Sequence, residues 1–108
     1  MRLHENFEWD EAKAEKNLKK HRVSFGDAAL VLADDEADAT HVEEFDPSHS
    51  DVEERYLTTA SHPDDRSIVL RISWTDRSTR NAKVTRIIST RLATKAEKAV
   101  YAKAIGGK

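Results

Sequence analysis

Arginine residues that could bind phosphate are concentrated in the second half of the chain. Arg77 follows a long apolar segment, Arg86 lies within the next such segment, and Arg91 lies near its end. A guanidinium group stays charged and presents a planar fork of donors that matches phosphate oxygens. Such groups could stabilise the charge that develops during cleavage of a phosphodiester. Alternatively, each arginine forms an ordinary surface ion pair with an acidic residue.

A second set of polar residues recurs at four-residue spacing near the N-terminus. Trp9, Lys13, Asn17 and His21 would form one stripe along a helix. Histidine exchanges a proton near neutral pH, so His21 is the candidate base for proton transfer. The stripe could line a phosphate groove or form a hydrogen-bonded seam against a sheet. We favour the seam, because histidine near a helix C-terminus often caps carbonyl groups.

The net charge of −2 hides an asymmetry along the chain. Residues 1–54 contain 6 Lys and Arg against 16 Asp and Glu, a net charge of −10. Residues 55–108 contain 12 against 4, a net charge of +8. The basic half favours a polyanionic partner. Alternatively, folding interleaves the two halves into a mixed surface of ordinary character.

Composition excludes several kinds of protein. The absence of Cys excludes a disulfide scaffold, a thiolate zinc site and a Cys nucleophile. His41, His49 and His62 lack a helical His-x-x-x-His spacing, so we expect no metal and no cofactor. No apolar run approaches the ~20 residues that span a membrane, and no secretory signal is visible. We expect one domain over residues 1–108, located in the cytoplasm and not in a membrane.

Three segments are predicted to be helical because each begins with a capping residue. These segments are 11–21 after Asp10, Ser24 to about Ala33, and the Thr94–Glu97 capping box to about Ala104, followed by Gly106-Gly107. Glu97 is sufficiently explained by this capping role. The acidic region between the second helix and residue 54 is weakly patterned, with a turn at Asp46-Pro47-Ser48 and then a loop or short surface helix.

Strands are predicted where β-branched and aromatic residues gather or alternate. They cover 7–9, 55–61, 66–75 and 83–90, with Val42 to Phe45 as a further short candidate. Short connections join the last three strands, which predicts an antiparallel meander. If the last strand has no bulge, Arg86 and Arg91 point to opposite faces. The prediction is an α+β domain of order β-α-α-β-β-β-α, an antiparallel sheet with helices packed on one face.

Three segments in this order resemble the BrnT family, the toxins of bacterial type II toxin–antitoxin pairs. They are FEWDEAKAEKNLKKHRVSFGDAALVLAD, DPSHSDVEERY and RIISTRLATKAEKAVY, which together cover most of the chain. The sequence departs from the family pattern at Arg22, where glycine is usual, and at Thr90, where alanine is usual. The loop at 76–82 is also longer than is common.

The resemblance implies a RelE-like ribonuclease fold and cleavage of RNA that inhibits translation. It also implies a BrnA-like antitoxin of ribbon-helix-helix type, which we expect to cover the basic strand surface and through which the toxin would meet DNA only indirectly. Cleavage at a 2′-hydroxyl requires removal of its proton, protonation of the 5′-oxygen and stabilisation of charge on phosphorus. We expect no metal to take part. The alternative is a catalytically silent binding module that acts through its complex with the antitoxin.

On this basis we assign the candidate residues to two roles. The catalytic candidates are Arg77, Arg91 and His21, and the RNA-binding candidates are Lys13, Arg55, Arg86, Lys98 and Tyr101. Arg55 could instead form an ion pair with Glu54 at a strand end. Tyr101 could stack on a base, or could be part of the core.

Overall fold

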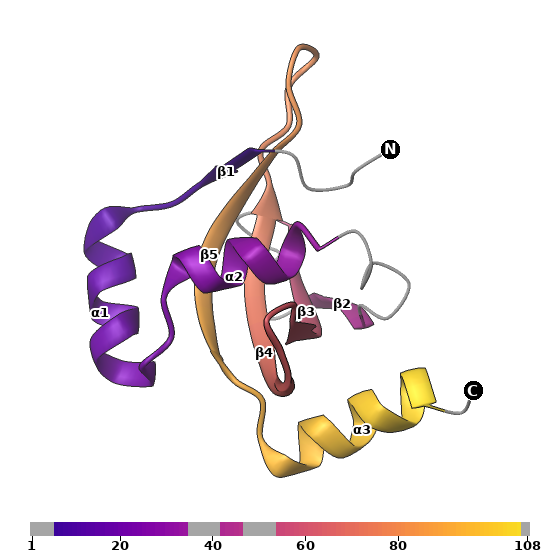
Figure 1. Cartoon of the computed structure of the whole chain (residues 1–108). Coiled ribbons are helices and arrows are strands. Elements are labelled where there is room, and N and C mark those ends of the chain that lie inside the picture. Colours follow the sequence, from indigo (N-terminus) through magenta and orange to yellow (C-terminus); the bar gives the residue numbers. More distant parts are fainter. Residues whose placement is uncertain (1–5, 35–41, 47–53, 107–108) are drawn as a thin grey trace.

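The computed structural model describes residues 6–34, 42–46 and 54–106 (Figure 1). These residues form helices α1 (Glu11–His21), α2 (Phe25–Leu32) and α3 (Lys95–Gly106), and strands β1 (Asn6–Glu8), β2 (Val42–Asp46), β3 (Arg55–His62), β4 (Asp65–Asp76) and β5 (Val84–Leu92). The predicted α+β class and element order are confirmed, with the short candidate strand present as β2. The predictions for Pro47 to residue 53 and for Gly107 lie outside the described residues.

The strands form one sheet in the order β1-β5-β4-β3-β2. Strands β2 to β5 are antiparallel neighbours, which confirms the predicted meander. Strand β1 pairs with β5 in parallel, from Asn6↔Val84 to Glu8↔Arg86. The prediction of a purely antiparallel sheet was therefore wrong at this edge. Short turns specify antiparallel neighbours, whereas this pairing joins opposite ends of the chain and has no local signal.

Helix α2 crosses one face of the sheet, which we call the inner face (Figure 1). There Phe25 and Leu32 of α2 pack with Leu70, Ile72 and Trp74 of β4. Side chains alternate along a strand, so Val69, Arg71 and Ser73 lie on the opposite, outer face. A separate cluster, Val69, Ala93 and Tyr101, joins α3 to that face. The expectation of helices on one face thus describes α1 and α2 but not α3.

Strand β5 contains a bulge that changes the direction of its arginines. Ser73 pairs with Ser89 but Trp74 pairs with Ile87, which leaves Ile88 as the extra residue. Arg86 is opposite Thr75 and Arg91 is opposite Arg71. Both arginines therefore lie on the outer face. The expectation that they point to opposite faces applied to an unbulged strand and was wrong.

Capping residues fix the ends of α1 and α2 as predicted. The Asp10 carboxylate accepts hydrogen bonds from the first-turn N–H groups of α1, and the Ser24 hydroxyl accepts one from Asp27. Arg22 ends α1 in the left-handed conformation, at φ 61° and ψ 24°, and its N–H bonds to the Leu18 carbonyl. Glycine is favoured at such a position, which explains the glycine of the family pattern.

Within the described residues, no helix has the length and apolar character required to cross a membrane.

Candidate nucleic-acid interface

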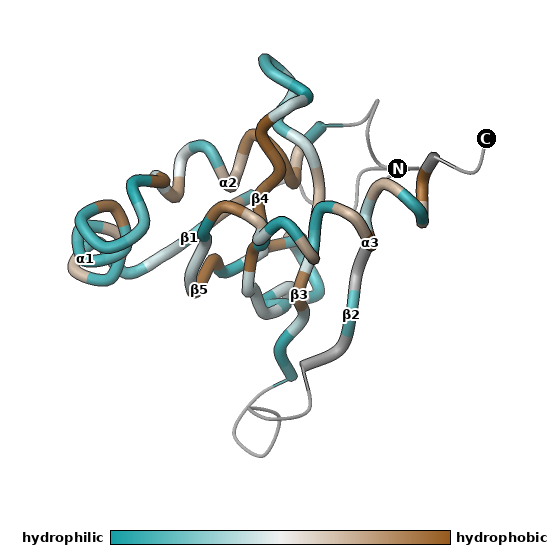
Figure 2. The backbone as a smooth tube through the Cα atoms, turned by 90° about the horizontal axis from the view of Figure 1, so that it is seen from below, coloured by the Kyte–Doolittle hydropathy of each residue, from teal (hydrophilic) through white to brown (hydrophobic). Residues whose placement is uncertain are grey.

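A groove between α1 and β5 gathers three of the four lysines of α1. Its volume is about 340 Å³, and it is lined by Lys13, Lys16, Asn17, Lys20, His21, Ile88 and Ser89. The α1 residues of this set are three or four positions apart, so they share one face of the helix. The tube coloured by hydropathy shows α1 as a largely hydrophilic helix (Figure 2). We call this feature the lysine groove.

Asn17 forms the buried seam between α1 and β5 and is only 7% exposed. Strand β1 pairs with β5 only at Val84 to Arg86, so the edge of β5 is open at Thr90. The Asn17 amide takes the place of a neighbouring strand there. Its Nδ2 donates to the Thr90 carbonyl at 2.8 Å, and its Oδ1 accepts from the Thr90 N–H at 3.1 Å. Nδ2 also donates to the Val23 carbonyl at 3.1 Å.

The seam and the groove are therefore both present on α1. Asn17 supplies the predicted hydrogen-bonded seam, whereas Lys13 and His21 line a groove beside it. Trp9 does not continue the stripe into the groove. Its ring packs edge-on against Phe25 with centroids 6.0 Å apart, and its indole N–H donates to the carboxylate at position 11.

The charges of the lysine groove have no ion-pair partner in the part of the chain that the structure describes. Among the described residues, no carboxylate forms an ion pair with Lys13, Lys16, Lys20 or His21. Exposed ammonium groups without partners are available to an external anion. The sequence prediction missed Lys16 and Lys20, although their spacing from Lys13 was a readable signal.

The outer face holds its arginines in a different way. Arg71 and Arg91 are opposite each other on β4 and β5, and Glu97 at the start of α3 binds both. The Glu97 carboxylate accepts hydrogen bonds from Arg91 at 2.6 and 2.8 Å and lies 3.2 Å from Nε of Arg71. Two like charges that face each other on neighbouring strands destabilise the pair. Glu97 therefore offsets the repulsion between Arg71 and Arg91.

Glu97 also completes the predicted capping box of α3. The Thr94 N–H donates to its carboxylate at 2.9 Å, and the Glu97 N–H donates to the Thr94 hydroxyl at 3.1 Å. The hydrogen bonds from Arg91, helped by the Thr94 N–H and the charge of Arg71, lower the pKa of Glu97 to about 2. The same hydrogen bonds raise the pKa of Arg91. One carboxylate therefore fixes two arginines and a helix terminus.

The structure does not bring Arg77 and Arg91 together. The Arg77 N–H donates to the Val84 carbonyl at 2.9 Å, so Arg77 lies level with the start of β5. Arg91 is 7 residues farther along, which is about 23 Å of extended strand. Figure 1 shows the β4–β5 hairpin projecting at the end of the sheet away from α3.

The remaining RNA-binding candidates are distributed over the outer face and α3. Arg86 forms an ion pair with Glu8 at 2.7 Å, and Arg55 is half-buried at the start of β3. Lys98 is exposed on α3. Tyr101 is 5% exposed, and its hydroxyl accepts a hydrogen bond from the N–H of residue 61 at 3.3 Å. The structure therefore shows Tyr101 packed in the core, which was the alternative to base stacking.

A second cavity, of about 280 Å³, lies between α3 and the outer face. It is lined by Glu44, Thr59, Arg71, Ala96, Glu97, Val100 and Tyr101. Arg71 is held there by Glu44 at 2.9 Å as well as by Glu97. The positive charge of Arg71 in this cavity is thus neutralised, in contrast to the charges of the lysine groove.

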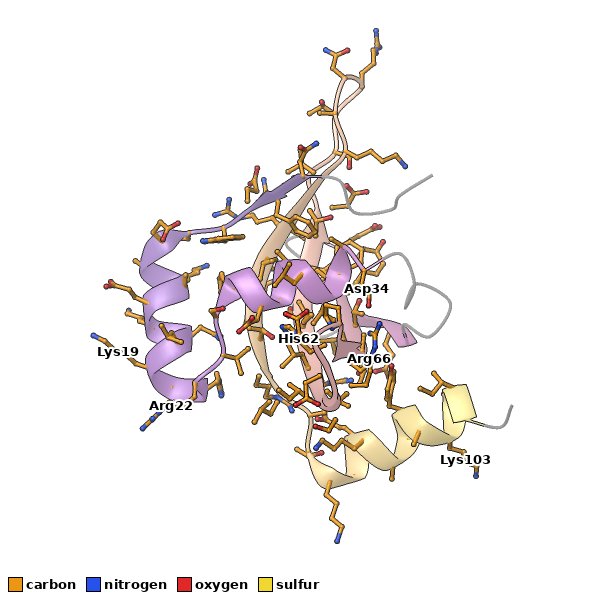
Figure 3. The ribbon with its side chains drawn as sticks, in the orientation of Figure 1. Lys19, Arg22, Asp34, His62, Arg66 and Lys103 are labelled. Atoms are coloured by element: carbon orange, nitrogen blue, oxygen red, sulfur yellow. The ribbon has the colours of Figure 1, made fainter. Side chains whose placement is uncertain are left out.

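His62 is used in a structural contact. Its Nε2 lies 3.2 Å from the Asp27 carboxylate of α2, and its Nδ1 accepts from the Asp64 N–H at 3.1 Å. Arg66 likewise binds Asp34 after α2 at 2.7 Å (Figure 3). In the parts of the chain that the structure describes, no three His, Asp or Glu side chains gather as metal ligands would.

Two regions of positive side chains thus adjoin on β5. Ser89 lines the lysine groove, and on β5 it lies between Arg86 and Arg91 on the outer face. The groove and the arginine face therefore meet at Ser89. This basic surface, in which the lysines are unpaired among the described residues and the arginines are paired, suits a phosphate-containing ligand. The imidazole beside it suits proton transfer.

The family model for the ribonuclease toxin BrnT of type II toxin–antitoxin systems matches residues 9–97 of this chain. The chain therefore belongs to the BrnT family. The matched range contains all of α1, strands β2 to β5 and Glu97. No curated protein matches the chain.

Proposed function

We propose that this chain is a metal-independent endoribonuclease that inhibits translation by cleaving RNA in the cytoplasm. Its membership of a family of ribonuclease toxins supports an activity on RNA. The observation that carries the proposal is the lysine groove, in which Lys13, Lys16, Lys20 and His21 have no carboxylate partner among the described residues. The RelE-like kinship that the sequence resemblance implies agrees with this function.

We assign His21 as the base of the reaction. It removes the proton of a 2′-hydroxyl, and the 2′-oxygen attacks the adjacent phosphorus. The bond from phosphorus to the 5′-oxygen breaks, and a lysine ammonium of the groove protonates that oxygen. The remaining ammonium groups stabilise the charge on phosphorus. The products are a 2′,3′-cyclic phosphate and a free 5′-hydroxyl.

The arginines take a secondary part in this proposal. Arg86 and Arg91 flank Ser89 and extend the positive surface from the groove over the outer face. Each would exchange its carboxylate for a phosphate when RNA binds. Arg77 is too far from Arg91 to act on the same phosphate, so we do not retain these two as a catalytic pair.

We further propose a BrnA-like, ribbon-helix-helix antitoxin as the partner, with DNA contacted only through it. A type II toxin requires an antitoxin, and the outer face offers arginines that it could mask. Charge reversal by Arg91→Glu is expected to weaken the complex at least tenfold, as measured by calorimetry. Unchanged affinity would locate the antitoxin elsewhere.

Cleavage of RNA by purified chain, freed of its partner and supplied with EDTA, tests the main proposal. The expected result is cleavage with a 2′,3′-cyclic phosphate end by the wild type and by Lys19→Gln, and cleavage at least about 100-fold slower by His21→Ala. Lys19 is a matched control, because it is on α1 but does not line the groove. A wild-type chain that cleaves nothing, is harmless when expressed and copurifies with its antitoxin would favour the catalytically silent binding module.

A further inference from the structure

We propose that the lysine groove is a track for single-stranded RNA in which Lys13, Lys16 and Lys20 bind successive backbone phosphates. This inference rests on the proposed ribonuclease function and specifies how the substrate is held. Lys16 and Lys20 line the groove beside Lys13 and His21, and we add them as substrate-binding residues.

The spacing of the lysines suits such a strand. Lys13 and Lys20 are seven residues apart on α1, a rise of about 10 Å along the helix axis. A stacked nucleic-acid strand advances about 3.4 Å per nucleotide, so the three ammonium groups cover roughly three nucleotides. His21 follows Lys20 directly and also lines the groove. A phosphate held by Lys20 therefore brings its neighbouring sugar to His21.

The lining of the groove favours contacts to the backbone over contacts to bases. Of the described residues that line it, only His21 has an aromatic ring, and that imidazole is assigned to proton transfer, so the groove has no row of rings on which successive bases could stack. The Asn17 amide is already bonded to the backbone at Thr90 and Val23, so it is not available to read a base edge. Binding in the groove is therefore tolerant of sequence and depends on charge.

Single-stranded RNA fits these observations better than a peptide or a duplex. Ile88 is the one apolar side chain larger than alanine among the residues that line the groove, which offers little anchorage to a peptide. Single-stranded RNA can splay its nucleotides, which the approach of the 2′-oxygen to phosphorus requires. Ser89, which lines the groove, lies between Arg86 and Arg91 along β5.

The test measures binding apart from cleavage. The probe is a fluorescently labelled 2′-O-methyl oligouridylate, which has no 2′-hydroxyl to react, and its affinity is followed by anisotropy in EDTA at increasing salt. Each phosphate contact to a single strand contributes about −0.7 to the slope of log K against log salt. The triple variant K13Q/K16Q/K20Q should lose about 2 from the magnitude of that slope. Between ~50 and ~200 mM salt, the wild type should therefore lose roughly 20-fold more of its affinity for the probe than the triple variant does.

Lys19→Gln is the matched control, because Lys19 is on the same helix and points away from the sheet (Figure 3). It should leave the slope unchanged. Lys13, Lys16 and Lys20 are exposed, so the triple variant should melt at the temperature of the wild type.

Three results would overturn the track. The first is a triple variant that melts normally and keeps the wild-type slope. The second is equal affinity for duplex RNA, and the third is displacement of the probe by polyglutamate as readily as by RNA. By contrast, a wild type that shows the expected slope and yet cleaves no RNA would support the track and refute the ribonuclease proposal.

Discussion

The lysines of α1 and the arginines of the outer face carry the same charge in opposite circumstances. On the outer face, Arg71 and Arg91 share Glu97, and Arg86 is bound to Glu8. In the lysine groove, none of the described carboxylates neutralises a lysine. Counting basic residues therefore does not locate a phosphate site. A phosphate site is better located by the basic residues that have no carboxylate partner.

The difference follows from where each set of side chains is placed. Arginines on neighbouring strands are only about 5 Å apart, so the sheet needs carboxylates between them. Lysines on one face of a solvated helix are separated by water and can remain unpaired at little cost. The groove can therefore keep its charge for a ligand, while the arginine face uses most of its charge to hold β1, β2 and α3.

The largest effect is expected from the base in the groove. His21→Ala should reduce RNA cleavage by about 100- to 10,000-fold, the usual contribution of general acid–base catalysis. Initial rates on a defined RNA in EDTA measure it, with Lys19→Gln alongside. If Arg91→Ala abolished cleavage while His21→Ala did not, the outer face, and not the lysine groove, would hold the catalytic site.

The seam that positions the groove should have the next largest effect. Asn17→Ala leaves the Thr90 N–H and carbonyl and the Val23 carbonyl without their partner in a buried site. The free energy of unfolding should fall by about 3 kcal/mol. Urea denaturation measures it, and Lys16→Ala on the same helix should change stability by less than about 0.5 kcal/mol. Equal losses in both variants would contradict a special role for the seam.

Breaking the arginine network should cost less. Glu97→Gln keeps a side chain that can cap α3 but removes the charge that binds Arg71 and Arg91. The expected loss in the free energy of unfolding is about 2 kcal/mol at neutral pH, since Glu97 is partly solvated. RNA binding in the groove should be retained. Loss of that binding would show that the two regions are not independent.

The pH dependence of the same contact has a defined sign. The pKa of Glu97 is lowered from 4.5 to about 2 in the folded protein, so its stabilisation is complete above pH 4.5. It is lost as the pH falls through about 2. The difference in stability between wild type and Glu97→Gln should therefore shrink over this acid range. Urea titrations at a series of pH values test this, and a constant difference would contradict the lowered pKa.

The smallest effect concerns the end of α1. Arg22→Gly should raise the free energy of unfolding by about 1 kcal/mol, because glycine tolerates the left-handed conformation at φ 61°. Thermal melting measures it, and Arg22→Ala should give no such gain, since alanine keeps the steric strain. Arg22 does not line the groove, so RNA binding should be unchanged in both variants.

Local sequence signals located most of the elements. Asp10, Ser24 and the Thr94–Glu97 pair each cap a helix as their spacing predicts, because these hydrogen bonds join residues only two or three positions apart. Alternation along 66–75 correctly places Leu70, Ile72 and Trp74 in the core, whereas Ile68 on the same predicted face is 37% exposed. The spacing of Lys13 and His21 placed them on one side of α1, and the structure brings them to one groove.

The features that could be seen only in the tertiary structure depend on residues far apart in the chain or on a single inserted residue. The parallel pairing of β1 with β5 joins positions that have no local signal between them. The bulge at Ile88 reverses the faces expected for Arg86 and Arg91, because one extra residue shifts the alternation. Glu97 captures Arg71 and Arg91 only because α3 folds back onto the outer face. Sequence alone determined which residues carry positive charge; only the fold decided which of those charges are neutralised, since the carboxylates that bind Arg71 and Arg86 come from distant elements.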